Sequence, residues 1–248
     1  MPGLIDLHCH ILPGIDDGAQ TIEDTKELLE ESMRGGVKQY VFTLHFYPER
    51  MDISTFLSGR TGAVQQMRAL LEADAIAYRC GAEIAYVPFF EQLPLEKLTF
   101  GNTNYLLMEL DTRYLQPGVE DAIRAVVDQG LKPILAHVER YIYVEQDPTL
   151  LYRWVKAGAL AQVNAGFVLR DARSRKRVLQ LAGWNLIHLM ASDAHSMDWR
   201  PPLLVEGYEK LPAELSARFQ INAEDIFSGN PIKIIPPMCP KRHWSGWK

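Results

Sequence analysis

The sequence predicts an α/β fold, a distorted barrel of seven parallel strands joined by helices, (β/α)7. Apolar, β-branched and aromatic segments alternate with amphipathic segments, which is typical of parallel βαβ units and not of hairpins. At intervals of 26 to 38 residues a polar residue, mostly of a metal-binding type, follows a predicted strand. Because the carboxyl ends of barrel strands meet at one mouth, we expect these side chains to lie together. They are His8, His45, Glu83, Glu109, His137, Asn164 and Asp193.

The elements of the N-terminal half follow from local patterns. After a first buried strand, Thr21 is the expected N-cap of an amphipathic helix that ends at Gly35 and Gly36. Runs of β-branched and aromatic residues predict two further strands, and the third leads to Glu83. The expected strands are residues 4–8, 38–44 and 75–79, and the second helix is residues 53–73.

The C-terminal half repeats the alternation with shorter intervals. Four apolar runs predict strands that end just before Glu109, His137, Asn164 and Ser192-Asp193. The helices between them each end at a glycine, the usual helix-stopping residue. The expected strands are residues 105–108, 133–136, 160–163 and 186–191, and the expected helices are residues 119–129, 150–157 and 173–181, closed by Gly130, Gly158 and Gly183.

Composition limits the classes of function. A net charge of −5 and a pI near 5.8 offer no broad basic surface for a nucleic-acid backbone. Three cysteines without a C-x-x-C pair argue against a disulfide framework, so a reducing compartment is expected. The N-terminus has neither a basic leader nor a long apolar stretch. We expect a cytoplasmic protein with no nucleic-acid partner and no stable membrane insertion, and its oligomeric state stays open.

The chain is expected to form one domain at residues 1–235, because 47% hydrophobic residues suffice for a single core of this size. Residues 236–248 are a basic and aromatic tail. Such a tail is able to dock a kinase or an anionic membrane, but we favour a flexible extension.

The stretch from Asp6 to His10 indicates that the site binds metal ions. In an extended chain residues two apart share a face, so His8 and His10 point together while Cys9 points away. One such pair is often structural, but five of the seven histidines follow predicted strands: 8, 10, 45, 137 and 195. Imidazoles and carboxylates without thiolates favour manganese, iron or zinc in a catalytic site. The ligands exceed the needs of one ion, so we expect two or three.

Four motifs closely resemble one family of enzymes. They are residues 6–19, 81–84, 134–140 and 185–195, and they are similar to the PHP (polymerase and histidinol phosphatase) superfamily. Within it, the Asp-Asp-Gly loop, His-x-Glu-Arg and Ser-Asp-Ala-His resemble the tyrosine-protein phosphatases of capsule and exopolysaccharide operons, the CpsB/YwqE type. The resemblance covers nearly the whole chain. It implies a TIM-like PHP barrel, a trinuclear site usually associated with manganese (Mn2+), and dephosphorylation of a tyrosine autokinase.

The resemblance also implies a role for individual residues. The implied ligands are His8, His10 and Asp193 for one ion, Glu109 and His137 for a second that Glu83 bridges to the first, and Asp17, His45 and His195 for a third. Arg140 and Arg200 match positions that grip the phosphate, and with Asp193 and His195 they make up the expected catalytic set. Asp16 is expected to be a loop or capping residue and is given less weight than Asp17.

The expected reaction is hydrolysis of phosphotyrosine by metal-activated water, without a covalent intermediate. Cysteine phosphatases use Cys-x5-Arg, but none of the three cysteines is followed by an arginine at that spacing. The alternatives are a histidinol-phosphate or other small phosphomonoester phosphatase, and a binding module without turnover. A metal-dependent amidohydrolase would normally want a bridging lysine, which no predicted strand end supplies.

Overall fold

The computed structural model describes residues 3–240, and its named strands pair in parallel throughout. They form two sheets. The first contains β1 (Leu4–Cys9), β2 (Val37–Phe42) and β4 (Ala77–Cys80). The second contains β3 (His45–Phe46), β5 (Glu83–Ala85), β6 (Tyr105–Glu109), β7 (Lys132–Leu135), β8 (Leu160–Asn164) and β9 (Leu189–Ala191).

The two sheets together form the predicted seven-stranded barrel. Strand β2 runs on into β3, and β4 runs on into β5, with Gly81 N donating to Phe42 O and Glu83 N to Leu44 O. The first and last strands meet where Cys9 pairs with Ala194. The predicted fold class is therefore confirmed, and the breaks between β2 and β3 and between β4 and β5 are its distortions.

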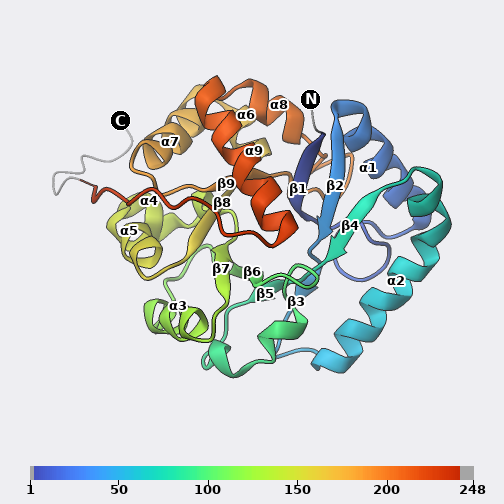
Figure 1. The fold of residues 1–248 in the computed structure, drawn as a ribbon, viewed down its shortest axis with the longest axis horizontal. Coiled ribbons are helices and arrows are strands. Elements are labelled where there is room, and N and C mark those ends of the chain that lie inside the picture. Colours follow the sequence, from blue (N-terminus) through green and yellow to red (C-terminus); the bar gives the residue numbers. More distant parts are fainter. Residues whose placement is uncertain (1–2, 241–248) are drawn as a thin grey trace.

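Helices surround the strands (Figure 1). The two longest in the first half begin and end close to prediction, and at α1 Thr21 and Asp24 form a reciprocal capping box while Gly36 takes the left-handed conformation. The helices are α1 (Ile22–Gly35), α2 (Ile53–Ala73), α3 (Val119–Asp128), α4 (Ile142–Gln146), α5 (Thr149–Lys156), α6 (Ala165–Arg170), α7 (Ala172–Gly183), α8 (Leu204–Glu209) and α9 (Ala213–Ser228), with 3-10 turns at Phe90–Gln92, Leu95–Lys97 and Val138–Arg140.

Two boundary predictions were wrong. The strand expected at residues 38–44 stops at Phe42, because the chain there leaves the first sheet and pairs again only at His45, with β5. Helix α7 ends at Gly183 as expected, but the residue in the left-handed conformation is Asn185, with φ 57°, and the strand predicted to begin at residue 186 starts later. Strand β9 accordingly begins at Leu189 and not at residue 186.

Along strand β1, the side chains that face the barrel interior switch from odd-numbered to even-numbered residues. Ile5 and Leu7 belong to an interior apolar cluster, whereas Cys9 packs in the layer between strands and helices. The pairing of β1 with β2 is irregular in this stretch. The irregularity turns both His8 and His10 inward while Cys9 points away, as the sequence predicts.

Helix α9 closes the end of the barrel opposite the predicted site. It lies against β1 and β9 (Figure 1). Its Ala223 and Ile226 join the interior cluster with Tyr105, Leu160 and Leu189, the first residues of β6, β8 and β9. The other end, where the strands finish, is thus left for polar side chains.

The start of the tail lies against the loop after α7, where Met238 N donates to Trp184 O and Asn185 donates to Pro236 O. Its basic and aromatic residues from 241 onward lie outside the described residues, and the division at residue 235 stays a prediction. Across residues 3–240, no helix has both the length and the apolar character needed to cross a bilayer.

Candidate metal centre

Glu83, the first residue of β5, lies at the centre of a buried polar cluster and is 0% exposed. Its Oε2 lies 3.3 Å from His8 Nε2, 3.2 Å from His10 Nε2 and 3.1 Å from His45 Nδ1. Its Oε1 lies 3.0 Å from His137 Nε2. Four imidazoles from the ends or starts of three strands therefore surround a single carboxylate.

This carboxylate requires positive charge beside it. Neither oxygen of Glu83 has a hydrogen-bond partner within residues 3–240, and a buried carboxylate without partners is strongly disfavoured. Burial favours the neutral acid, but the charges of His8 and His45 hold the pKa of Glu83 well below its usual range. Protons on the imidazoles or bound metal ions are the two possible sources of that charge.

The orientation of two imidazoles favours metal ions. His8 and His10 direct their Nε2 atoms at each other, 3.1 Å apart. On the other edges, His8 Nδ1 lies 3.2 Å from Gln162 Oε1 and His10 Nδ1 lies 2.7 Å from Asp16 Oδ2. These oxygens only accept hydrogen bonds, so each Nδ1 carries a proton, and when the two rings are neutral their Nε2 lone pairs face each other with repulsion. A divalent cation at the Nε2 atoms removes the repulsion, and the residues fit such a group.

The predicted ligands gather in three overlapping groups, in each of which the candidate ligand atoms lie within 4.8 Å of one another. The groups are His8, His10, Glu83 and Asp193; His45, Glu83 and Glu109; and His10, Asp17, His45 and His195. His137 adjoins the second group, since its Nε2 lies 3.4 Å from Glu109 Oε1. All nine predicted ligands thus come together, and three of them, Glu83, His10 and His45, each belong to two groups. Their role as ligands stays a prediction.

Two of these residues have strained backbones. His137 has φ 30° and Asp193 has φ 55°, in the left-handed region that residues with a side chain seldom occupy. Asp193 is held there because its N–H donates to His8 O at 2.8 Å. Such strain is often found at functional sites, where surrounding contacts maintain it.

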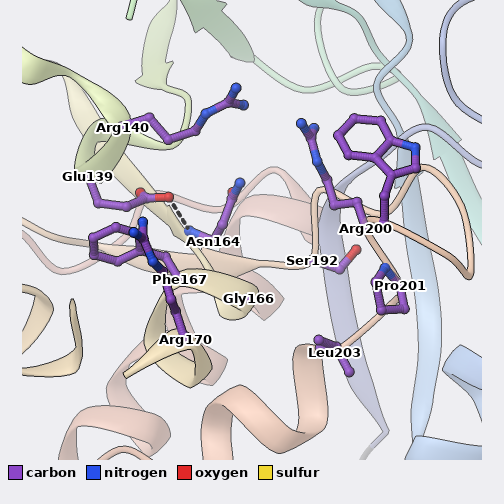
Figure 2. Close-up of a pocket in the computed structure, with 11 residues that line it drawn as sticks. Glu139, Arg140, Asn164, Gly166, Phe167, Arg170, Ser192, Arg200, Pro201 and Leu203 are labelled. Carbon is purple, nitrogen blue, oxygen red and sulfur yellow. Dashed lines mark hydrogen bonds between the residues drawn. The ribbon is translucent and has the colours of Figure 1, made fainter. Parts of the chain in front are cut away.

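Arg140 and Arg200 both approach Asp193. Arg200 Nη1 lies 2.9 Å from Asp193 Oδ2 and Arg140 Nη1 lies 3.7 Å from the same atom. Figure 2 shows the two guanidinium groups at the same end of a cavity, reached from opposite sides. The sequence places both arginines at the barrel mouth, and the structure brings them together there.

Asp16 lies in the loop after β1 and contacts a predicted ligand, His10. Besides contacting His10, its carboxylate accepts from His45 N at 2.9 Å and Gly18 N at 3.0 Å. Burial opposes ionisation, but the charge of His10 and these hydrogen bonds hold the pKa of Asp16 well below its usual range. Asp16 is thus the loop residue that the sequence predicts, and from within the loop it also orients His10, while Asp17 is the one of the two that belongs to a candidate ligand group.

Gln162 was missed altogether. Its Oε1 accepts from His137 N at 2.7 Å as well as facing His8, and its Nε2 donates to Asn164 Oδ1 at 2.7 Å. Asn164 in turn donates to Asp193 Oδ2 at 2.6 Å. Asn164, the one strand-end residue not predicted as a ligand, therefore orients a predicted ligand. Gln162 could have been found, since it lies two residues before Asn164 and shares its face of β8.

Glu139, beside Arg140 in the sequence, is also buried near this site. Its Oε1 accepts from Asn164 N at 3.3 Å (Figure 2). Burial raises the pKa of Glu139 to about 7, although the charges of His137 and Arg140 act in the opposite direction. Its carboxyl therefore titrates closer to neutral pH than an exposed glutamate does.

Known proteins are similar to this chain over nearly its whole length. The tyrosine-protein phosphatase CpsB of Streptococcus pneumoniae is 29% identical over 247 residues, which cover 94% of this chain and 98% of that protein. The tyrosine-protein phosphatase YwqE of Bacillus subtilis (strain 168) is 29% identical over 248 residues, covering 96% and 97% of the two chains.

Solved structures and a family model agree with these relatives. A chain from the crystal structures of YwqE and CpsB, described as unique metal-dependent tyrosine phosphatases, superposes with a TM-score of 0.87 at 28% identity, covering 96% of this chain and all of the other. The model of the family described as capsular polysaccharide synthesis, CpsB/CapC, matches residues 4–236. The chain therefore belongs to the CpsB/CapC family of capsular polysaccharide synthesis proteins.

Proposed function

We propose that this protein is a metal-dependent protein-tyrosine phosphatase that acts on a phosphotyrosine protein, such as a tyrosine autokinase of capsular or exopolysaccharide synthesis. The observation that carries the proposal is the Glu83 cluster of nine candidate ligands with two arginines at its edge. The names of the relatives support the reaction and the family description supports the capsular context. The cytoplasmic location expected from the sequence is part of this proposal.

The donor set suits hard or borderline divalent ions. All nine candidate ligands offer nitrogen or oxygen, and Cys9 faces away, so we expect two or three manganese ions, with iron or zinc as alternatives. When bound, divalent ions lower the pKa of water and neutralise phosphoryl oxygens.

The side chains of this chain prepare the site. Gln162 and Asp16 keep the protons of His8 and His10 on Nδ1, which leaves each Nε2 available as a ligand. We propose that Arg140 and Arg200, whose guanidinium groups lie at the same end of the cavity (Figure 2), donate to the nonbridging oxygens of the phosphate, where charge redistributes during in-line displacement. The phenol of tyrosine has a pKa of about 10, so its phenolate leaves with less help from an acid than an alkoxide needs.

A chelation experiment tests the proposal. Protein stripped of metal should lose turnover of a phosphotyrosine peptide and regain it with Mn2+, and blocking its thiols should have no effect. The kcat/KM for the phosphotyrosine peptide should exceed the values for a phosphoserine peptide and for histidinol phosphate. Full activity of verified metal-free protein would refute the metal mechanism. The highest kcat/KM on histidinol phosphate would instead favour the small-substrate phosphatase.

A further inference from the structure

A cavity of about 450 Å3 opens beside the Glu83 cluster, within the usual size range of small-ligand sites. Arg140 and Arg200 line one end of it, and Asn164 lies between them in the centre (Figure 2). Four apolar side chains also line it: Phe167, Trp199, Pro201 and Leu203. We shall call this space the aryl cavity.

We propose that the aryl cavity binds the aromatic ring of the substrate phosphotyrosine, with Phe167 and Trp199 as its aromatic walls. The inference rests on the proposed function and names the residues that make the site selective for an aryl phosphate. A phosphate between the two guanidinium groups leaves its ester oxygen and ring to extend along the apolar lining. An alkyl phosphate lacks the ring and leaves these walls without contacts.

Both aromatic walls are fixed in place by arginines. The Trp199 ring lies 4.4 Å from the Arg200 guanidinium carbon and packs edge-on against His195 at 5.3 Å, although Trp199 is 57% exposed. The Phe167 ring lies 5.3 Å from the guanidinium carbon of Arg177. Rings held in this way present aromatic surface at little entropic cost when a ligand binds.

Charge distinguishes the aryl cavity from its neighbour. A second cavity of about 320 Å3 lies on the other side of Arg140 and is lined by Tyr47 and Tyr86, but also by Glu109 and Asp111. The aryl cavity has three arginines, the third being Arg170, and the carboxyl of Glu139. A phosphotyrosine carries about two negative charges, so the more cationic cavity is its better host.

Binding of two phosphonates to the Mn2+-loaded protein tests the inference by calorimetry. Phenylphosphonate and methylphosphonate share the charged group and differ by the ring. Wild type should prefer the phenyl compound about ten-fold, and Phe167→Ala should remove most of that preference while methylphosphonate affinity stays within about two-fold. Phe167→Leu, which retains apolar volume, should give an intermediate loss. Phe167 is the better test because Trp199 also contacts Arg200 and His195.

Matched controls make each outcome decisive. Phe89 is 69% exposed and lines neither cavity, so Phe89→Ala should bind both compounds as wild type does. Three results would each overturn the inference. The Phe167 variants would lose affinity for both compounds equally, or they would lose affinity for neither, or the affinity for phenylphosphonate would fall in Tyr86→Leu instead. If the wild type hydrolyses phosphotyrosine but binds the two phosphonates equally, only the role proposed for the aryl cavity would be refuted. Absence of turnover on every phosphomonoester would defeat the proposed function.

Discussion

At the scale of single residues, the two arginines differ in how they touch Asp193. Arg200 makes a hydrogen bond of 2.9 Å to Oδ2 and also lies 3.2 Å from the imidazole nitrogens of His195. Arg140 is more exposed and lies 3.7 Å from the same carboxylate oxygen. Arg200 therefore contacts two predicted ligands, whereas we predict that Arg140 acts mainly by contacting the substrate.

Alanine substitutions should separate these roles. Arg140→Ala should lower kcat/KM by about 10 to 1,000-fold with bound metal unchanged, since it removes a charge-assisted contact to the phosphate. Arg200→Ala should lower kcat/KM and also reduce the metal content, because Asp193 loses a partner that orients it. Steady-state kinetics and elemental analysis of the same samples give both readings. Wild-type kinetics in both variants would show that neither arginine takes part in the reaction.

Asp16 should affect metal affinity without being a ligand itself. Replacing it with alanine removes the acceptor of the His10 Nδ1 proton, so the ring is free to turn or change tautomer. We expect a loss of about 10 to 100-fold in Mn2+ affinity, measured by titration of the metal-free protein. Asp198→Asn, an exposed change on a mouth loop, should leave the affinity unchanged. Equal affinities of wild type and the Asp16 variant would contradict this role.

Residue types and spacing predicted where the candidate ligands gather, because strand ends converge and alternate residues share a face. They did not predict the side chains that hold those ligands. Gln162 has no charge and is not a common ligand, so a search for metal-binding residue types passes over it. Asp16 and Asp17 are adjacent, and only the fold decides which one turns toward His10.

At the scale of elements, α6 and α8 meet at a point with no spare room. A Cβ on Gly207 would lie 2.7 Å from Ala165 Cβ and 3.1 Å from Met190 Cε. Ala165 is the first residue of α6, the helix that carries Phe167. The close approach at Gly207 therefore sets where one wall of the aryl cavity stands.

Gly207→Ala should destabilise the protein by about 1 to 3 kcal/mol, because overpacking forces the two helices apart. Gly62→Ala is the matched control, since a Cβ there meets nothing within 4 Å and the residue lies inside α2. That change should stabilise by about 0.5 to 1 kcal/mol. Urea unfolding of the three proteins measures both differences. A Gly207 variant as stable as wild type would mean that α8 moves aside freely.

The sequence predicted most of the longer elements and missed the short ones. Helices α4, α6 and α8 have five or six residues, too few for a periodic pattern to appear. Helix α9 is long enough, but its place across the strand starts depends on the closure of the barrel. The break between β2 and β3 depends on a change of pairing partner, which a continuous apolar run does not reveal.

At the scale of the whole molecule, stability should depend on pH through His188. Burial, with a smaller contribution from the charge of Arg218, lowers its pKa to about 4, and its Nδ1 accepts from Ala161 N at 3.0 Å. The unfolded chain binds this proton near pH 6.5 and the folded chain only near pH 4. The free energy of unfolding should therefore fall as pH drops from about 6.5 to 4, by at most about 3 kcal/mol.

The variant His188→Asn isolates this effect, since its amide oxygen is able to replace Nδ1 as the acceptor. The difference in unfolding free energy between wild type and variant should shift in favour of the variant as pH falls from 7 to 4.5. Denaturant titrations at several pH values measure it, and the predicted ligands titrate equally in both proteins. A constant difference across this range would show that His188 is not the group responsible.

The joint between the first and last strands has a consequence for synthesis. Asp6 accepts from Ser192 N, 186 residues further along the chain, and Asp193 N donates to His8 O. A nascent chain on the ribosome therefore holds His8 and His10 long before Asp193 and His195 emerge. Contacts of such high sequence separation form late and slowly. Chains that stop before residue 193 would lack both Asp193 and His195, so the cell would make the full set of candidate ligands only after translation has passed His195.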